Sequence, residues 1–272
     1  MVHSMKTGPQ IDNRFQSDAG KYASYLETPE GRLRLDLAFA NLQEFLPARQ
    51  ENKPPSALDL GCGTGATAIR LARLGYSVTL LDSSEAMLEI AQRASHEAGV
   101  SDRVTVRRGD AAKFSTLFSA RSFDVILVHN VLEYVDDPGA VLAGAAGLLR
   151  DSSSVLSVLV RNQAGEVLKA AIQAGDLAGA EDALNSEWGQ ESLYGGKVRL
   201  FALEQLRELT NTASLKVIAE RGVRVVADYL PAKVSRSDEY DRIYGLERKL
   251  GGRTEFVGAS RYIQILVRGT RA

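Results

Sequence analysis

The chain has 272 residues, of which 44% are hydrophobic and 25% are charged, and its formal net charge is −1. These values suit one large globular domain, and no overall electric field demands a nucleic-acid or membrane partner. The single cysteine, Cys62, excludes an intramolecular disulfide and a cysteine-rich metal site, so we expect a cytoplasmic protein without a bound metal. No signal peptide and no apolar run of about 18 residues is visible, so we expect no membrane span.

Residues 1–46 are predicted to form a helical cap ahead of the main fold. Apolar residues recur at helical spacing from Asp12 to Leu26. A second helix is expected after Thr28, because Thr28 can cap it and is followed by a proline and an acidic residue in the first turn. Residues 47–56 are polar and proline-rich, which is typical of a linker.

The stretch LDLGCGTGA, residues 58–66, joins a short apolar strand to a helix through alternating glycines. Such a turn brings bare backbone N–H groups close to a ligand. The next apolar strand ends in Asp82, where an acidic group can hold the two hydroxyls of a ribose. The glycines run G-x-G-x-G where the dinucleotide fingerprint has G-x-G-x-x-G. Together with Asp59 they resemble the S-adenosylmethionine pocket of class I methyltransferases.

Strands and helices alternate after residue 57, which predicts an α/β fold with a doubly wound, mostly parallel sheet. Seven strands are expected, over 57–60, 77–81, 104–107, 123–128, 155–160, 215–226 and 261–267. The sixth is expected to be bent or interrupted at Gly222. Residues 163–200 break the alternation, and we interpret them as a helical insertion over the ligand-binding edge. The methyltransferase-like domain is expected to span 57–272, with the cap as part of it.

Ligands in such sheets bind beyond the carboxyl ends of the strands. There, Asp110 could accept a hydrogen bond from the exocyclic amine of an adenine. A backbone N–H of Ala111 or Ala112 could meet a nitrogen of the adenine ring. His129, at the end of the fourth strand, has three interpretations: a cofactor contact, which we favour, a general base, or a structural donor.

Several longer stretches carry a more specific resemblance. They are 31–34 (GRLR), 124–135 (DVILVHNVLEYV), 222–225 (GVRV), 228–230 (DYL) and 261–263 (RYI). With the glycine motif, these stretches are similar to those of the bacterial tRNA 5-carboxymethoxyuridine methyltransferases, which have the class I fold that depends on S-adenosylmethionine. The resemblance implies methylation of the carboxylate of 5-carboxymethoxyuridine at the tRNA wobble position. The product would be a methyl ester, and tRNA would be the partner.

The resemblance also implies which residues contact the cofactor. It adds Arg34, as the partner of the methionine carboxylate of S-adenosylmethionine, because a bidentate pair would fit there. It also adds Cys62 of the glycine loop. The full set of expected cofactor-binding residues is Arg34, Asp59, Gly61, Cys62, Gly63, Asp82, Asp110, Ala111, Ala112 and His129.

A carboxylate acceptor is already ionised at neutral pH, so we expect no catalytic base. The carboxylate has to be held and desolvated, which arginine side chains do well. The candidates for binding it are Arg161, Arg224, Tyr229, Arg261 and Tyr262. Two alternatives stay open. One is a small-molecule carboxylate or hydroxyl O-methyltransferase, in which His129 would take the proton of a hydroxyl. The other is an S-adenosylmethionine-binding protein without catalysis.

Overall fold

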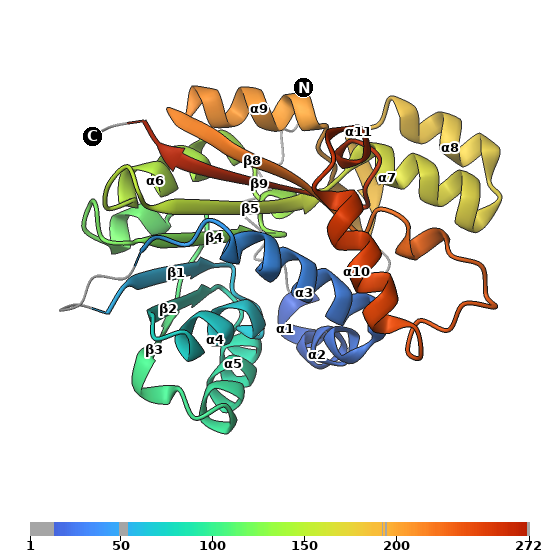
Figure 1. Ribbon diagram of the computed structural model, residues 1–272. Coiled ribbons are helices and arrows are strands. Elements are labelled where there is room, and N and C mark those ends of the chain that lie inside the picture. Colours follow the sequence, from blue (N-terminus) through green and yellow to red (C-terminus); the bar gives the residue numbers. More distant parts are fainter. Residues whose placement is uncertain (1–13, 49–53, 192, 194, 271–272) are drawn as a thin grey trace, which may run out of the picture.

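The computed structural model describes residues 14–48, 54–191, 193 and 195–270 (Figure 1). The cap contains α1 (Arg14–Ser17), α2 (Ala19–Glu27) and α3 (Pro29–Gln43). The single helix expected over 12–26 is therefore wrong: Asp18 interrupts it with a non-helical backbone, and residues 12 and 13 lie outside the described residues. Thr28 caps α3 as predicted, since its Oγ1 accepts from the Gly31 N–H at 3.1 Å.

The central sheet has seven strands in the order β3-β2-β1-β4-β5-β9-β8. Six strands run in one direction and β9 runs opposite to them, which confirms the predicted doubly wound, mostly parallel sheet. The strand order reverses between β1 and β4, and a ligand crevice is expected at that switch point. The strands are β1 (Ser56–Leu60), β2 (Ser77–Asp82), β3 (Val104–Arg108), β4 (Val125–His129), β5 (Val155–Arg161), β8 (Leu215–Val223) and β9 (Tyr262–Gly269).

Helices cover both faces of this sheet. On one face, α3, α4 (Ala66–Arg73) and α5 (Glu85–Glu97) contribute Leu42, Ala68 and Ala91 to a buried cluster that also contains Ala57 of β1 and Val78 of β2. On the other, α6 (Pro138–Leu148) and α9 (Leu203–Thr212) bury Leu142 and Leu206. Each fully buried leucine stabilises the fold by roughly 1.5–3 kcal/mol. Short 3₁₀ helices span Ser101–Arg103, Phe114–Leu117, Leu132–Tyr134 and Ala227–Tyr229.

The segment expected as an insertion contains α7 (Gln163–Leu168), a π-helix (Lys169–Ala174) and α8 (Leu177–Leu184). It also contains an antiparallel hairpin that was not expected, formed by β6 (Trp188–Gln190) and β7 (Lys197–Arg199). Figure 1 shows α7 and α8 beyond the carboxyl end of β5, on the side of the sheet edge where α10 (Tyr240–Gly251) also lies. The short helix α11 (Thr254–Val257) follows α10.

Strand β8 is shorter than expected, because the chain leaves the sheet after Val223. Arg224 has a φ of +59°, which is incompatible with an extended strand. The irregularity of the strand lies between Val217 and Ala219, and Gly222 pairs regularly with Ile263 before the strand ends at Val223, so the expected bend or interruption at Gly222 itself is wrong. No helix in the described part of the chain is long and apolar enough to cross a membrane.

Candidate active site

A cavity of about 1260 Å³ lies at the carboxyl ends of the parallel strands. It exceeds the roughly 300–1,000 Å³ of an ordinary small-molecule pocket, so a cofactor and part of a second molecule can share it. Its walls come from the glycine loop, the cap, the insertion and the segments around β8 and β9. The predicted site residues that line it are Arg34, Gly61, Gly63, Asp82, Asp110, Ala111, Ala112, His129, Arg161, Arg224, Arg261 and Tyr262.

The glycine loop follows β1 with a backbone that side chains would obstruct. Gly61 has a φ of +64°, and a Cβ added there would lie only 2.5 Å from Val131 Cγ2. Gly63 has a φ of +52°, and its N–H donates to Asp82 Oδ2 at 2.9 Å. Asp82 Oδ1 accepts from the Ser84 N–H at 2.8 Å. Because each carboxylate oxygen can accept more than one hydrogen bond, Asp82 keeps capacity for ribose hydroxyls.

Asp59 and Cys62 lie outside the main cavity, against a separate cavity of about 40 Å³. Burial, followed by the charge of Asp82, raises the pKa of the Asp59 carboxyl to about 8. Burial also raises the pKa of the Cys62 thiol. The Cys62 N–H donates to Leu81 O at 3.1 Å, which ties the loop to β2. The structure therefore places these two side chains beside the smaller cavity, and the backbone of Cys62 holds the loop against β2.

Asp110 and the two alanines after it line the cavity beyond β3. The Ala112 N–H donates to Asp110 Oδ1 at 2.8 Å. The Ala111 N–H has no hydrogen-bond partner among the described residues. Of the two N–H groups expected to meet an adenine nitrogen, Ala111 is therefore the better placed.

Arg34 reaches the cavity from α3 and is only 6% exposed. Its Nη1 donates to Asn130 Oδ1 at 3.2 Å, and its Nη2 donates to the Tyr22 hydroxyl at 3.0 Å. Its guanidinium carbon lies 5.2 Å from the ring centre of Tyr25 and 5.5 Å from that of Tyr262. No carboxylate pairs with Arg34 within the described residues. A carboxylate ligand would supply the missing charge.

His129 ends β4 and lines the same cavity. Its Nε2 lies 2.8 Å from Ser157 Oγ. Burial, followed by the charge of Arg34, lowers the pKa of the imidazole to about 3. The ring is therefore neutral at physiological pH and is a poor proton acceptor, which disfavours the general-base interpretation.

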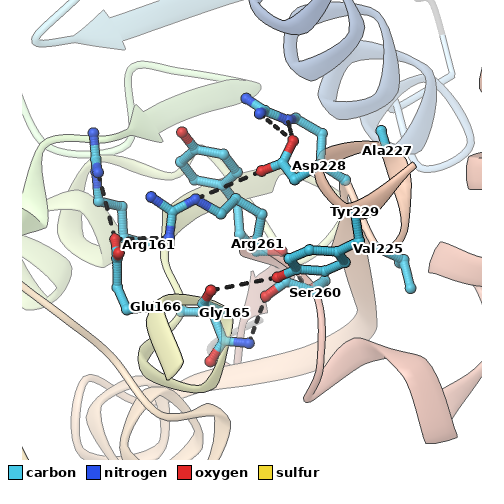
Figure 2. A network of polar contacts seen from close by, with 12 residues as sticks. Arg161, Gly165, Glu166, Val225, Ala227, Asp228, Tyr229, Ser260 and Arg261 are labelled. Carbon is cyan, nitrogen blue, oxygen red and sulfur yellow. Dashed lines mark hydrogen bonds and ion pairs between the residues drawn. The ribbon is translucent and has the colours of Figure 1, made fainter. Parts of the chain in front are cut away.

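The other end of the cavity holds a cluster of buried arginines. Arg161, at the end of β5, and Arg261, just before β9, share the Glu166 carboxylate, at N–O distances of 3.6 and 2.7 Å (Figure 2). Arg161 Nη2 also donates to Glu191 Oε1 at 2.7 Å. Arg161 is 9% exposed and Arg261 is 4% exposed. Two guanidinium groups are thus held together out of bulk water.

Arg224 joins this cluster from the turn after β8. Its Nε donates to Asp228 Oδ1 at 2.8 Å, and its Nη1 donates to the Tyr25 hydroxyl at 3.0 Å. Asp228 Oδ2 lies 3.7 Å from Arg261 Nε (Figure 2). Lys169 of the insertion lines the same end. The cationic groups outnumber the carboxylates there, so this end of the cavity carries net positive charge.

Tyr262 lies at the centre of the arginine cluster. Its ring centre is 5.8 Å from the guanidinium carbon of Arg224 and 5.9 Å from that of Arg261. Burial disfavours the ionised phenol, but the surrounding arginines outweigh burial and lower the pKa of Tyr262 to about 7. The shifted pKa reflects the positive potential into which an anionic substrate would bind.

Tyr229, expected to bind substrate, does not line the cavity. Its hydroxyl donates to the Gly165 carbonyl at 3.4 Å, so it connects the turn after β8 to α7 (Figure 2). A Cβ added at Gly165 would lie only 2.7 Å from Ser260 O, so α7 packs closely on the segment before β9. The structure gives Tyr229 a supporting position beside the arginines.

A buried carboxylate anchors the turn that carries Arg224 and Asp228. Glu247 of α10 is fully buried, and its two oxygens accept from the N–H groups of residues 225–227 at 2.6–2.9 Å. Three donors on one carboxylate fix the path of a turn that includes an arginine at positive φ. Glu247 therefore sets the position of Arg224 from outside the cavity.

The lining also contains side chains that the sequence did not indicate as functional. They include Tyr22 and Tyr25 of α2, Lys169 and Gln173 of the π-helix, and Glu191 after β6. The two tyrosines lie in a helix whose apolar spacing indicated only a packing role. Lys169, Gln173 and Glu191 lie in the insertion 163–200, which contains no recognisable motif. The only signal for these three residues was the prediction that the insertion lies over the ligand-binding edge of the sheet.

Comparison with known proteins identifies relatives of this chain among methyltransferases. Residues 57–152 match the methyltransferase domain family. The chain is 28% identical over 264 residues to the tRNA 5-carboxymethoxyuridine methyltransferase of Escherichia coli (strain K12), covering 94% of this chain and 96% of that protein. It is 33% identical over 126 residues to the ubiquinone biosynthesis O-methyltransferase of Xanthomonas axonopodis pv. citri, covering 46% of this chain and 52% of that protein.

Solved structures show the same fold at low sequence identity. A methyltransferase in complex with the Haloferax volcanii Trm112 activator superposes with a TM-score of 0.65, at 17% identity, covering 96% of this chain and 98% of that one. The 1,6-didemethyltoxoflavin-N1-methyltransferase of Burkholderia thailandensis, bound to S-adenosylhomocysteine, superposes with a TM-score of 0.59 at 17% identity. The match covers 99% of this chain and 93% of that one. The chain is therefore an S-adenosylmethionine-dependent methyltransferase that resembles the tRNA 5-carboxymethoxyuridine methyltransferases.

Proposed function

We propose that the protein methylates the carboxylate of 5-carboxymethoxyuridine at the wobble position of tRNA. The observation that carries this proposal is the arginine cluster at one end of the cofactor cavity. Arg34 lies near one anion site, and Arg161, Arg224 and Arg261 surround a second. The similarity to the Escherichia coli tRNA 5-carboxymethoxyuridine methyltransferase extends over 94% of the chain, which supports the same acceptor.

The residues around the glycine loop fit S-adenosylmethionine. The close approach of Val131 leaves no room for a side chain at Gly61, so bare backbone faces the ligand there. We assign the ribose to Asp82, the methionine carboxylate to Arg34, and the adenine to Asp110 and Ala111. When bound, the cofactor supplies an electrophilic methyl group on a positively charged sulfur.

The transfer requires no proton acceptor from the protein. An oxygen of the acceptor carboxylate forms the new C–O bond while the methyl–sulfur bond breaks, which leaves S-adenosylhomocysteine. The acceptor, with a pKa of about 4, is already ionised. The arginines desolvate and orient it, and below pH about 7 the Tyr262 hydroxyl is a neutral donor beside them. We therefore propose no general base, in keeping with the neutral His129.

We also propose that residues 1–46 and the insertion 163–200 belong to one catalytic domain with the rest of 57–272. In support, Arg34 of the cap and Lys169 of the insertion line the same cavity. Residues 191–272 contain 15 lysines and arginines against 10 acidic residues, which suits a polyanionic substrate. A tRNA substrate would place the enzyme in the cytoplasm.

The test is methyl transfer from deuterated S-adenosylmethionine to tRNA that carries unesterified 5-carboxymethoxyuridine. Mass analysis of the nucleosides should show one labelled methyl group on that nucleoside. Arg261→Met should abolish the transfer, whereas Arg253→Met, at a side chain that is 65% exposed, should preserve it. Turnover should also fall steeply between about 50 and 200 mM salt, because phosphate contacts release counterions.

Three results would contradict the proposal. Transfer to small carboxylic acids without transfer to any tRNA would favour a small-molecule enzyme. Transfer to a hydroxyl would favour the activity named for the ubiquinone biosynthesis relatives. Binding of S-adenosylmethionine without transfer to any acceptor would favour a non-catalytic protein.

A further inference from the structure

A line of buried polar side chains runs through the sheet from α3 to the cavity. It consists of Asn41 on α3, Gln264 on β9, Ser157 on β5 and His129 at the end of β4. Ser157 and Gln264 are fully buried, and Asn41 is 4% exposed. Burying such groups among apolar neighbours costs free energy unless each donor and acceptor has a partner. Here their partners fix the direction of every hydrogen bond.

The direction is set by the backbone carbonyl of Ala38, which can only accept. Gln264 must turn its Nε2 toward Ala38 O, which lies 2.9 Å away. The second hydrogen of the same nitrogen goes to Ser157 Oγ, also at 2.9 Å. The Gln264 Oε1 accepts from Asn41 Nδ2 at 2.9 Å. Both amide hydrogens of Gln264 are therefore used.

The hydrogen bond from Gln264 also determines which atom the Ser157 hydroxyl donates to. Its oxygen accepts from Gln264, so its own hydrogen is left for His129 Nε2 at 2.8 Å. That hydroxyl has no other acceptor in the described part of the chain. Nε2 must then accept, and the single hydrogen of a neutral imidazole resides on Nδ1. Nδ1 has no partner among the described residues, and His129 lines the cavity.

We infer that Asn41, Gln264 and Ser157 are positioning residues that hold His129 in the Nδ1–H tautomer, as a fixed hydrogen-bond donor toward an acceptor atom of the bound cofactor. In this state Nε2 is occupied by Ser157 and takes no proton from a substrate. The charge of Arg34 also opposes protonation of the ring. The inference goes beyond the proposed function, because it concerns the state of His129 whichever acceptor is methylated.

The test is ¹⁵N NMR of the protein labelled at histidine. The chain has three histidines, so the spectrum is simple, and His129→Gln assigns the signals of His129. We expect a protonated Nδ1 and an unprotonated Nε2 from about pH 5.5 to 8, with and without S-adenosylhomocysteine. A proton on Nε2, or titration of the ring in that range, would overturn the inference without affecting the proposed acceptor.

Two serine variants test whether the line causes this state. Ser157→Ala removes the donor to Nε2, so the His129 signals should shift toward a mixture of both tautomers. Ser154→Ala is the matched control, because Ser154 is equally buried, directly precedes β5 and lies outside the line. It should leave the signals unchanged. Wild-type signals in folded Ser157→Ala would refute the role of the line. If Ser157→Ala does not fold, the wild-type spectrum still shows which ring nitrogen of His129 carries the hydrogen, and a proton on Nε2 overturns the inference.

Discussion

Replacing Arg34 with methionine should weaken cofactor binding strongly while changing the stability of the fold only slightly. Arg34 is 6% exposed and has no carboxylate partner among the described residues. A bidentate pair with the methionine carboxylate consists of two charge-assisted hydrogen bonds, each contributing about 1.5 kcal/mol or more. Their loss of about 3 kcal/mol corresponds to a Kd for S-adenosylhomocysteine that is raised about 100-fold. Measured below pH 7, where Tyr262 is neutral, the ligand-free protein should lose less stability than a variant that leaves a buried carboxylate unpaired, because Arg34 gives up only its hydrogen bonds to Asn130 and Tyr22.

Arg224→Met is the matched comparison, because Arg224 is equally buried but pairs with Asp228. Leaving the Asp228 carboxylate buried and unpaired should cost about 3–5 kcal/mol of unfolding free energy. Affinity for S-adenosylhomocysteine should be close to that of the wild type. Calorimetric titration and urea unfolding without ligand measure the two quantities. The reasoning fails if Arg34→Met binds S-adenosylhomocysteine as tightly as the wild type, or loses as much stability as Arg224→Met.

Three further changes have distinct expected outcomes. Gly61→Ala should lose more stability than Gly99→Ala in urea unfolding: both glycines have positive φ, which costs about 1–2 kcal/mol, but only Gly61 faces a neighbour at 2.5 Å. Equal losses would refute the steric argument. The kcat/KM for the acceptor should fall as pH rises through about 7, because ionised Tyr262 repels a second anion, and Tyr262→Phe should remove this fall. Glu247→Gln should raise KM for the acceptor about tenfold and leave the Kd of S-adenosylhomocysteine unchanged, since it loosens only the turn after β8. An equal loss of both affinities would contradict this.

Much of the fold could be predicted because it depends on local pattern. Short apolar runs that alternate with helical spacing identified all seven strands of the sheet within a few residues. The hairpin of β6 and β7 was missed because strands of only three residues are too short to show such a pattern. The end of β8 was also missed. The sequence GVRVVAD continues to look like a strand, and the carboxylate that turns the chain there, Glu247, lies twenty residues away.

The candidate site could be predicted where a topological rule applies. Parallel strands end at one edge of the sheet, so Asp82, His129 and Arg161 were expected to lie together, and all three line the cavity. The rule says nothing about the direction of a side chain, so it could not predict that Tyr262 lines the cavity and Tyr229 does not. It also says nothing about an insertion, whose path decides that Lys169 reaches the cavity.

The place of β9 in the sheet has a consequence for how the enzyme matures. This strand follows the others in the chain, yet it lies between β5 and β8, and β8 has no other neighbour among the strands that the structure describes. While a ribosome is still making 262–269, β8 has no partner and the sheet is open. Tyr262 and Gln264 enter together with β9, so the arginine cluster and the line to His129 are completed in the same late event. A nascent chain can thus fold its glycine loop before β9 is made, but it gains a finished acceptor site only once β9 has joined the sheet.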